Sequence, residues 1–182
     1  MIMIFLNKKE IWEFAKLIVV SLLIIIPVRF YIAQPFIVSG NSMDASFLNG
    51  DYLIIDEISY QFKKPERGEV VVFRYPLDPS KFFIKRIIGL PGETVRIQNG
   101  AITIINEKYP AGMNLDEDYV KGYTRFSATT TLGKGEYFVL GDNREFSSDS
   151  RQWGSLSEKM IVGRSLVRLW PLAGAGLWPG IK

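Results

Sequence analysis

The feature that most constrains the fold is one long apolar segment near the N-terminus. Within residues 11–30, the run from Leu17 to Val28 carries no charged side chain, and apolar residues occupy every face of the helix it would form. No polar stripe is left for solvent, which argues against an amphipathic helix packed on a domain. The run is shorter than the roughly 20 residues that cross a bilayer, but Lys16 and Arg29 have the reach to snorkel to opposite interfaces. We therefore predict a membrane anchor within residues 1–33.

The charges around this segment predict its orientation. Lys8, Lys9 and Lys16 lie on its N-terminal side and only Arg29 on the other, so the positive-inside rule predicts an internal N-terminus. A cleaved signal peptide is the alternative, but the Ser-Gly-Asn-Ser stretch downstream is only a weak cleavage pattern. We expect a single-pass protein of the bacterial cytoplasmic membrane, with residues 34–182 on the extracytoplasmic side. Three aromatic residues suit the interfaces: Trp12, Phe30 and Tyr31.

Beyond residue 51 the sequence has the composition of a β-domain. Short runs of β-branched and aromatic residues alternate with turn residues, and Asn99-Gly100 between two such runs is the clearest hairpin pattern. Residues 107–134 are more polar, and we predict an excursion from the core sheet there. Strands are predicted at 52–58, 69–75, 82–88, 94–98, 101–106, 136–140 and 160–169. We expect a mainly β fold, a partly open antiparallel β-barrel-like catalytic domain behind one transmembrane helix.

The C-terminal tail is apolar but interrupted. Pro171 and Pro179 break residues 169–179 too often for a second membrane span. Trp170 and Trp178 suit a membrane interface, and a tail packed against the β-domain explains the same composition. The sequence leaves both interpretations open.

Composition excludes several kinds of chemistry. The 182 residues include no histidine and no cysteine, which rules out disulfides, thiolate nucleophiles, cysteine-ligated zinc and the Ser-His-Asp triad. The net charge of +3 is too small to indicate nucleic acid as a partner, and no basic run contains interleaved aromatics. We expect no metal and no cofactor. A serine nucleophile in this chain would need a base other than imidazole.

Ser42 and Lys85 are the candidates for such a pair. Ser42 lies in the Gly- and Asn-rich stretch 39–51, directly after the apolar segment, where most serines are solvated or capping groups. Lys85 lies in a predicted strand whose alternation puts Phe83 and Ile87 on the same face. Burial there would lower the pKa of its amine, because desolvation penalises the charged form. An edge-strand lysine with its head in water is the alternative.

A third polar cluster spans residues 141–154. Asp142, Arg144, Asp149 and Arg151 are suited to form two ion pairs that pin the loop, and the Ser147 hydroxyl is suited to hydrogen-bond a nearby amine. A solvated charged loop is the ordinary interpretation of such a composition. Nothing in this cluster alone indicates catalysis.

Together the three clusters resemble the type I signal peptidases, membrane-anchored Ser-Lys endopeptidases, over nearly the whole chain. The nucleophile motif of that family corresponds to residues 42–47 with Gly50-Asp51. Its lysine motif corresponds to residues 74–92, and its third motif to Gly141-Asp-Asn-Arg144 with residues 147–151. Three motifs in the right order behind an apolar segment are far more specific than a lone Ser-Met pair.

The resemblance implies a role for each of these residues. Ser42 would be the nucleophile and Lys85 the general base, while the backbone N–H groups of Ser42 and Gly40 would form the oxyanion hole. The supporting residues would be Ser147, which orients the lysine, and Asp149, Arg151 and Asp142. The contacts to small substrate side chains would come from Phe36, Val38 and Met43.

The sequence departs from the family pattern just after the candidate nucleophile. Ala45 replaces a proline and Ser46 a threonine, which would loosen the turn, and Asp44 puts a carboxylate two residues from Ser42. These departures bear on efficiency and substrate range more than on reaction type.

The resemblance predicts a membrane-bound serine endopeptidase that removes signal peptides from exported preproteins, with signal peptides and the lipid bilayer as its partners. Two alternatives remain: a Ser-Lys autopeptidase of the SOS-repressor type, and a membrane-tethered β-domain that binds partners without catalysis. A distance of about 3 Å between Lys85 Nζ and Ser42 Oγ would support the dyad.

Overall fold

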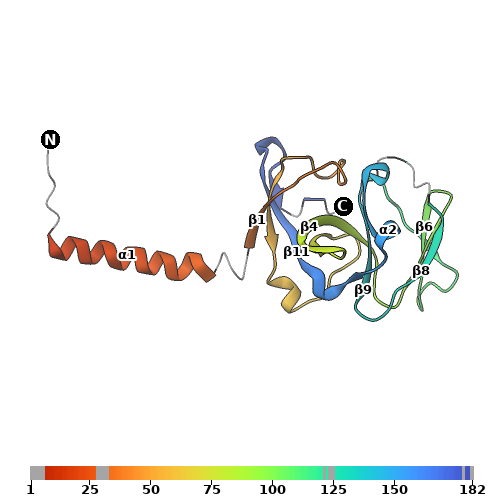
Figure 1. The fold of residues 1–182 in the computed structure, drawn as a ribbon, viewed down its shortest axis with the longest axis horizontal. Helices are drawn as coiled ribbons and strands as arrows, with labels where there is room; N and C mark the ends of the chain where they lie inside the picture. The colour runs from red at the N-terminus through yellow and green to blue at the C-terminus, as the bar shows by residue number, and fades with distance from the viewer. Residues whose placement is uncertain (1–6, 28–32, 121, 123–125, 178, 181–182) are drawn as a thin grey trace.

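The computed structural model describes residues 7–27, 33–120, 122, 126–177 and 179–180. Its one long helix, α1 (Lys8–Pro27), stands apart from a β-rich domain (Figure 1). The start of the helix is stabilised by a hydrogen bond from the Asn7 N–H to the Glu10 carboxylate at 2.8 Å, which is one half of a capping box. The large apolar side chains of α1 that the structure describes, such as Trp12 and Leu23, are exposed.

The predicted transmembrane helix needs a correction. Across the described part of the chain, no helix has both the length and the apolar character of a membrane span. The predicted interfacial residues Arg29, Phe30, Tyr31 and Trp178 lie outside the described residues. The division of the chain at residue 33 stays a prediction.

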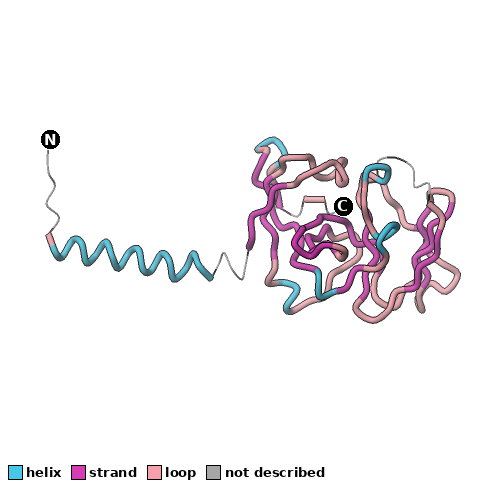
Figure 2. Tube along the Cα trace, in the orientation of Figure 1, coloured by secondary structure: helices cyan, strands magenta, loops and turns pink. Residues whose placement is uncertain are grey.

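The domain is mainly β, as predicted (Figure 2). All strand pairs among the described residues are antiparallel. The larger sheet has the order β1-β2-β11-β3-β4-β9-β10, with β12 paired to β11. Its strands are β1 (Ala33–Ile37), β2 (Tyr52–Asp56), β3 (Val70–Tyr75), β4 (Asp78–Gly89), β9 (Glu136–Leu140), β10 (Leu156–Ser157), β11 (Ile161–Trp170) and β12 (Gly176–Leu177). Between them lie α2 (Ser150–Trp153) and the 3₁₀ turns η2 (Ser59–Gln61), η3 (Arg144–Phe146), η4 (Glu158–Met160) and η5 (Leu172–Gly174).

The second sheet holds the predicted hairpin. Its order is β7-β6-β5-β8, from β5 (Thr94–Gln98), β6 (Ala101–Ile105), β7 (Met113–Asn114) and β8 (Ala128–Thr131). Asn99 and Gly100 have φ of 49° and 83°, which is the pair of positive φ values that a type I′ turn needs. β7 and β8 come from the predicted excursion and extend this sheet. Neither sheet closes into a barrel within the described residues, so the expected barrel-like closure is not shown.

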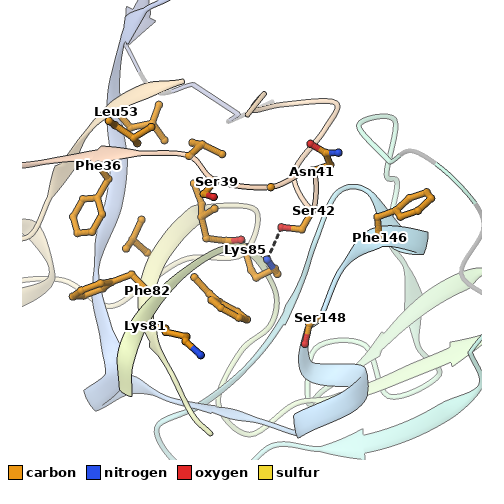
Figure 3. A pocket seen from close by; sticks show the side chains of 16 residues that line it. Phe36, Ser39, Asn41, Ser42, Leu53, Lys81, Phe82, Lys85, Phe146 and Ser148 are labelled. Carbon is orange, nitrogen blue, oxygen red and sulfur yellow. Dashed lines mark hydrogen bonds between the residues drawn. The ribbon is translucent and has the colours of Figure 1, made fainter. Parts of the chain in front are cut away.

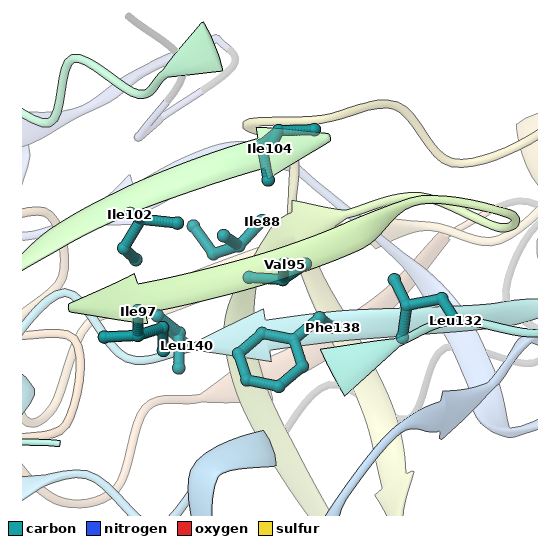
Figure 4. Packing of buried hydrophobic residues seen from close by; sticks show 8 residues of the cluster. All are labelled: Ile88, Val95, Ile97, Ile102, Ile104, Leu132, Phe138 and Leu140. Carbon is teal, nitrogen blue, oxygen red and sulfur yellow. The ribbon is translucent and has the colours of Figure 1, made fainter. Parts of the chain in front are cut away.

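An apolar core joins the two sheets (Figure 4). It combines residues of β4 and β9 with alternate residues of β5 and β6, as expected for strands with one buried face. Its buried members are Ile88, Val95, Ile97, Ile102, Ile104, Leu132, Phe138 and Leu140. This packing fixes β4, which carries Lys85, and its neighbour β9, which leads into the segment of residues 141–154.

The C-terminal tail packs back on the larger sheet. β12 pairs with β11, and the carbonyl of Gly180 accepts a hydrogen bond from Arg86. Trp170 is 59% exposed at the end of β11. The contacts of the tail match the interpretation in which it packs on the domain.

Candidate active site

Ser42 lies on the loop of residues 38–51, which connects β1 to β2 and which we call the Ser42 loop. Backbone hydrogen bonds between Val38 and Asp51 and between Gly50 and Val38, both 2.9 Å, close its base. Two side chains of the loop, Met43 and Phe47, are fully buried in the core beneath it. The loop is therefore anchored by apolar packing, and Met43, the predicted substrate contact, faces the core instead.

Lys85 comes to this loop from β4. β4 is central in the larger sheet, with Val71 opposite Lys85 on β3 and Leu140 opposite Arg86 on β9. Lys85 Nζ lies 2.7 Å from Ser42 Oγ, in hydrogen-bond contact, and donates to the Ile84 carbonyl at 2.8 Å. The two side chains are thus in contact, although they are 43 positions apart in sequence.

The surroundings of Lys85 favour its neutral form. Its side chain is only 3% exposed, and its amine lies 5.3 Å from the centroid of the Phe83 ring. Burial lowers the pKa of Lys85 to about 8, and the negative charges of Asp149 and Asp142 partly oppose this by favouring the protonated amine. Desolvation is the larger effect.

The segment after β9 holds the Ser42 loop in place from the other side. The Asn143 N–H donates to the Ser42 carbonyl at 3.1 Å, and Asn143 Nδ2 donates to the Asn41 carbonyl at 3.0 Å. Gly141 permits this approach, because a Cβ at that position would lie 2.5 Å from the Ser42 carbonyl oxygen and 2.2 Å from Ser147 Oγ. Asn143 is a site residue that the sequence analysis missed.

Only one of the two ion pairs expected within residues 141–154 forms there. Asp149 pairs with Arg151 at 2.7 Å and also accepts the Gly141 N–H at 3.1 Å. Asp142 instead pairs with Arg86 at 2.6 Å. Arg144 pairs at 2.5 Å with Glu117, which lies in the predicted excursion of residues 107–134. The prediction of two local pairs was wrong because these buried charges take partners that are distant in sequence.

Arg86 is the second residue that the sequence analysis missed. Its buried guanidinium pairs with Asp142, donates to Ser46 Oγ at 3.0 Å, and lies 4.0 Å from the centroid of the Tyr119 ring. It also donates to the carbonyls of Gly68 and Gly180. Arg86 thus connects the lysine strand to the Ser42 loop and to the 141–154 segment. The sequence did contain one indication of this role: two charged residues, Lys85 and Arg86, lie next to each other inside an otherwise apolar strand.

Two predicted supporting groups have other surroundings than expected. Ser147 Oγ is buried beside Gly141 and has no hydrogen-bond partner among the described residues, Lys85 included. The Gly40 N–H, expected in the oxyanion hole, donates to Asn49 Oδ1 at 2.9 Å. The Gly40 amide is therefore engaged within the Ser42 loop.

A cavity of about 470 Å³ opens beside the Ser42–Lys85 pair (Figure 3). Phe36 and Val38 line it as predicted, whereas Met43 does not. The Phe36 and Phe82 rings meet edge to face there, with centroids 5.3 Å apart. The remaining lining residues are Ile37, Ser39, Gly40, Asn41, Leu53, Val72, Lys81, Phe83, Ile84, Phe146 and Ser148.

Comparisons with known proteins identify the family of this chain. A family model described as "Signal peptidase, peptidase S26" matches residues 11–170. The chain is 38% identical over 172 residues to "Probable signal peptidase I-2" of Synechocystis sp., covering 91% of this chain and 76% of that protein. It is 33% identical over 179 residues to "Signal peptidase IB" of Staphylococcus aureus, covering 91% and 93%. A crystal structure of a signal peptidase I from Enterococcus faecalis is 33% identical, with a TM-score of 0.48, covering 56% of this chain and 97% of that one. The chain therefore belongs to the signal peptidase family, peptidase S26.

Proposed function

We propose that Ser42 and Lys85 form the catalytic dyad with which this serine endopeptidase cleaves signal peptides from preproteins. The neutral amine of Lys85 takes the hydroxyl proton of Ser42, whose oxygen attacks the carbonyl carbon of the scissile bond. The protonated lysine gives that proton to the departing amine as the C–N bond breaks. Water then attacks the acyl-enzyme ester while Lys85 takes a proton from the water, and Lys85 returns this proton to Ser42 Oγ as the ester bond breaks. The signal peptide leaves with a new carboxyl end that ionises in solution.

One observation carries this proposal: a buried lysine amine with a pKa of about 8 lies 2.7 Å from a serine oxygen. A base must be within hydrogen-bond reach of the proton that it removes, and this distance meets that condition. With a pKa of about 8, roughly a tenth of the lysine is neutral at pH 7. An exposed lysine with an ordinary pKa would be neutral roughly three hundred times less often.

The neighbouring polar groups act through the dyad. Asp149 and Arg151 hold the Gly141 turn, and Asn143 holds the Ser42 carbonyl. Ser147 completes the set of positioning residues, since its buried and unpartnered hydroxyl is available to a rotated lysine amine. The Ser42 N–H stabilises the oxyanion.

The substrate binds extended beside the site, and the cavity accepts its small side chains. Phe36 and Val38 line the same cavity as Ser42, and their apolar side chains suit the small residues of an A-x-A-like cleavage site. The family assignment favours this reaction over autoproteolysis and over binding without catalysis.

The helix α1 attaches the enzyme to a membrane through its apolar side chains. Membrane attachment is supported by the large apolar side chains that α1 exposes, such as Trp12, Leu17 and Leu23. Exposed apolar surfaces of this kind mark membrane or partner contacts. Membrane fractions washed with high salt and then carbonate test this. Release of the full chain by either wash would contradict it.

The catalytic roles are tested by Ser42→Ala and Lys85→Ala in the full chain, assayed on a preprotein in detergent. Each variant should lose at least about a thousandfold in kcat/KM, because the nucleophile or its base is removed. Ser157→Ala and Lys64→Ala are the matched controls: both side chains are exposed, and Ser157 makes no capping hydrogen bond. Activity of either dyad variant near that of its control would refute the assignment.

The pH dependence tests the state of the lysine. Since the neutral amine is the active form, kcat/KM should rise with pH to a plateau above about 8, the pKa of Lys85. A rate that is constant between pH 6 and 9 would contradict a lysine base.

A further inference from the structure

Phe146 is an exposed aromatic side chain at the active-site cavity. It lines the cavity, yet 73% of it is exposed to solvent. In Figure 3 it lies on one side of the Ser42–Lys85 contact, while Phe36 and Phe82 lie on the other. Aromatic groups therefore lie on both sides of the dyad, and the proposed contacts to small substrate side chains involve only the side with Phe36.

The backbone that carries Phe146 is held firmly. The Phe146 N–H donates to the Asn143 carbonyl, and Asn143 is the residue that holds the Ser42 loop. On either side of it, Arg151 Nη2 donates to the carbonyls of Arg144 at 2.8 Å and Ser147 at 3.4 Å. Single exposed apolar residues are ordinary on protein surfaces, but this one is fixed to the same segment that positions Ser42.

The side of the dyad on which Phe146 lies defines what it can contact. Under the proposed function, on which this inference rests, residues before the scissile bond occupy the end of the cavity with Phe36 and Val38. An extended chain crossing Ser42 then places the residues after the bond at the opposite end, where Phe146 lies. A rigid aromatic ring stabilises an apolar or aromatic side chain that packs against it.

We propose that Phe146 forms a binding subsite for the first residues of the mature protein and favours an apolar or aromatic side chain directly after the cleaved bond. This role has a kinetic consequence. The mature part leaves when the acyl-enzyme forms, so the Phe146 contact is present during acylation and absent during deacylation. Phe146 then affects the first step alone.

The test uses the full chain in detergent with matched peptides that differ only in the residue after the cleaved bond: Phe, Leu, Ala or Asp. Wild-type enzyme should prefer Phe and Leu over Ala and Asp. In Phe146→Ala this preference in kcat/KM should fall about two- to tenfold, while Phe146→Tyr should retain it. The deacylation rate of a common acyl group and the Tm should not change. Phe62→Ala, which removes a more exposed phenylalanine outside the cavity, is the control.

Two results would overturn the inference while leaving the proposed function intact. One is a wild-type enzyme that cleaves all four peptides equally well. The other is a Phe146→Ala enzyme that slows all four peptides by the same factor or slows deacylation. If wild-type enzyme shows no Ser42-dependent cleavage of any peptide, the proposed function itself fails, and the subsite fails with it.

Discussion

The two sheets of this domain have different interiors. The smaller sheet contributes only apolar side chains to the core, and none of its four strands buries a charged residue. The larger sheet and the segment after β9 bury several charges. These are Asp56, Lys85, Arg86, Asp142, Arg144 and Asp149. Charges are costly to bury unless they are paired, so this difference separates an apolar part that stabilises the domain from the part that holds the proposed active site.

The difference also explains how each part responds to change. An apolar core depends on volume and on one face of each strand, so a truncation costs stability in proportion to the space it leaves. A buried charge network depends on specific partners, and losing one partner leaves another charge unpaired. Substitutions in the two regions should therefore affect stability by different mechanisms and by different amounts.

The largest effect on stability is expected from Arg86→Met. It leaves the Asp142 carboxylate buried without its partner, which should lower the free energy of unfolding by about 3–5 kcal/mol. Urea unfolding of the single variant and of Arg86→Met with Asp142→Leu measures this. The double variant should recover much of the loss, since the unpaired charge is gone. A single variant within about 1 kcal/mol of wild type would mean that the pair is not needed.

Ile102→Ala in the smaller sheet should cost about 3 kcal/mol, because it leaves a cavity in the core that joins the sheets. The change should have no effect on chemistry. Assayed well below its Tm, the variant should keep the wild-type kcat/KM and the same rise with pH near 8. A shifted pH profile would show that the two regions are coupled, against the comparison made above.

Lys85→Met should abolish activity yet stabilise the fold at pH 7, by about 3 kcal/mol. The folded pKa of Lys85 is about 8, below its ordinary 10.5, so between these values the unfolded chain binds more protons. The free energy of unfolding of wild type therefore rises with pH across this window, and that of the variant lacks this rise. Guanidinium unfolding at pH 7, 8, 9 and 10 compares them. Parallel curves would mean that Lys85 is charged in the folded enzyme.

The same contrast governs what the sequence predicts. β5 and β6 were predicted almost residue by residue, because alternation and an Asn-Gly turn are local properties. The burial of Lys85 followed from its apolar neighbours in the strand. The contact with Ser42 rested on family resemblance, because no local pattern joins residues 43 positions apart. For the same reason the partners of Asp142 and Arg144 were missed. β1 was not predicted either; it contains Pro35, which an edge strand tolerates.

The smallest effect concerns Ser46, where the chain departs from the family's threonine. Its hydroxyl accepts a hydrogen bond from Arg86 Nη2 at 3.0 Å, and the same nitrogen also donates to Asp142 at 2.6 Å. Ser46→Ala should therefore cost only about 1 kcal/mol, because Arg86 keeps its stronger partner. Ser46→Thr retains the hydroxyl and should match wild type in both the free energy of unfolding and kcat/KM. If Ser46→Thr were as destabilising as Ser46→Ala, the space beside Arg86, and not the hydroxyl, would determine which side chain is tolerated at this position.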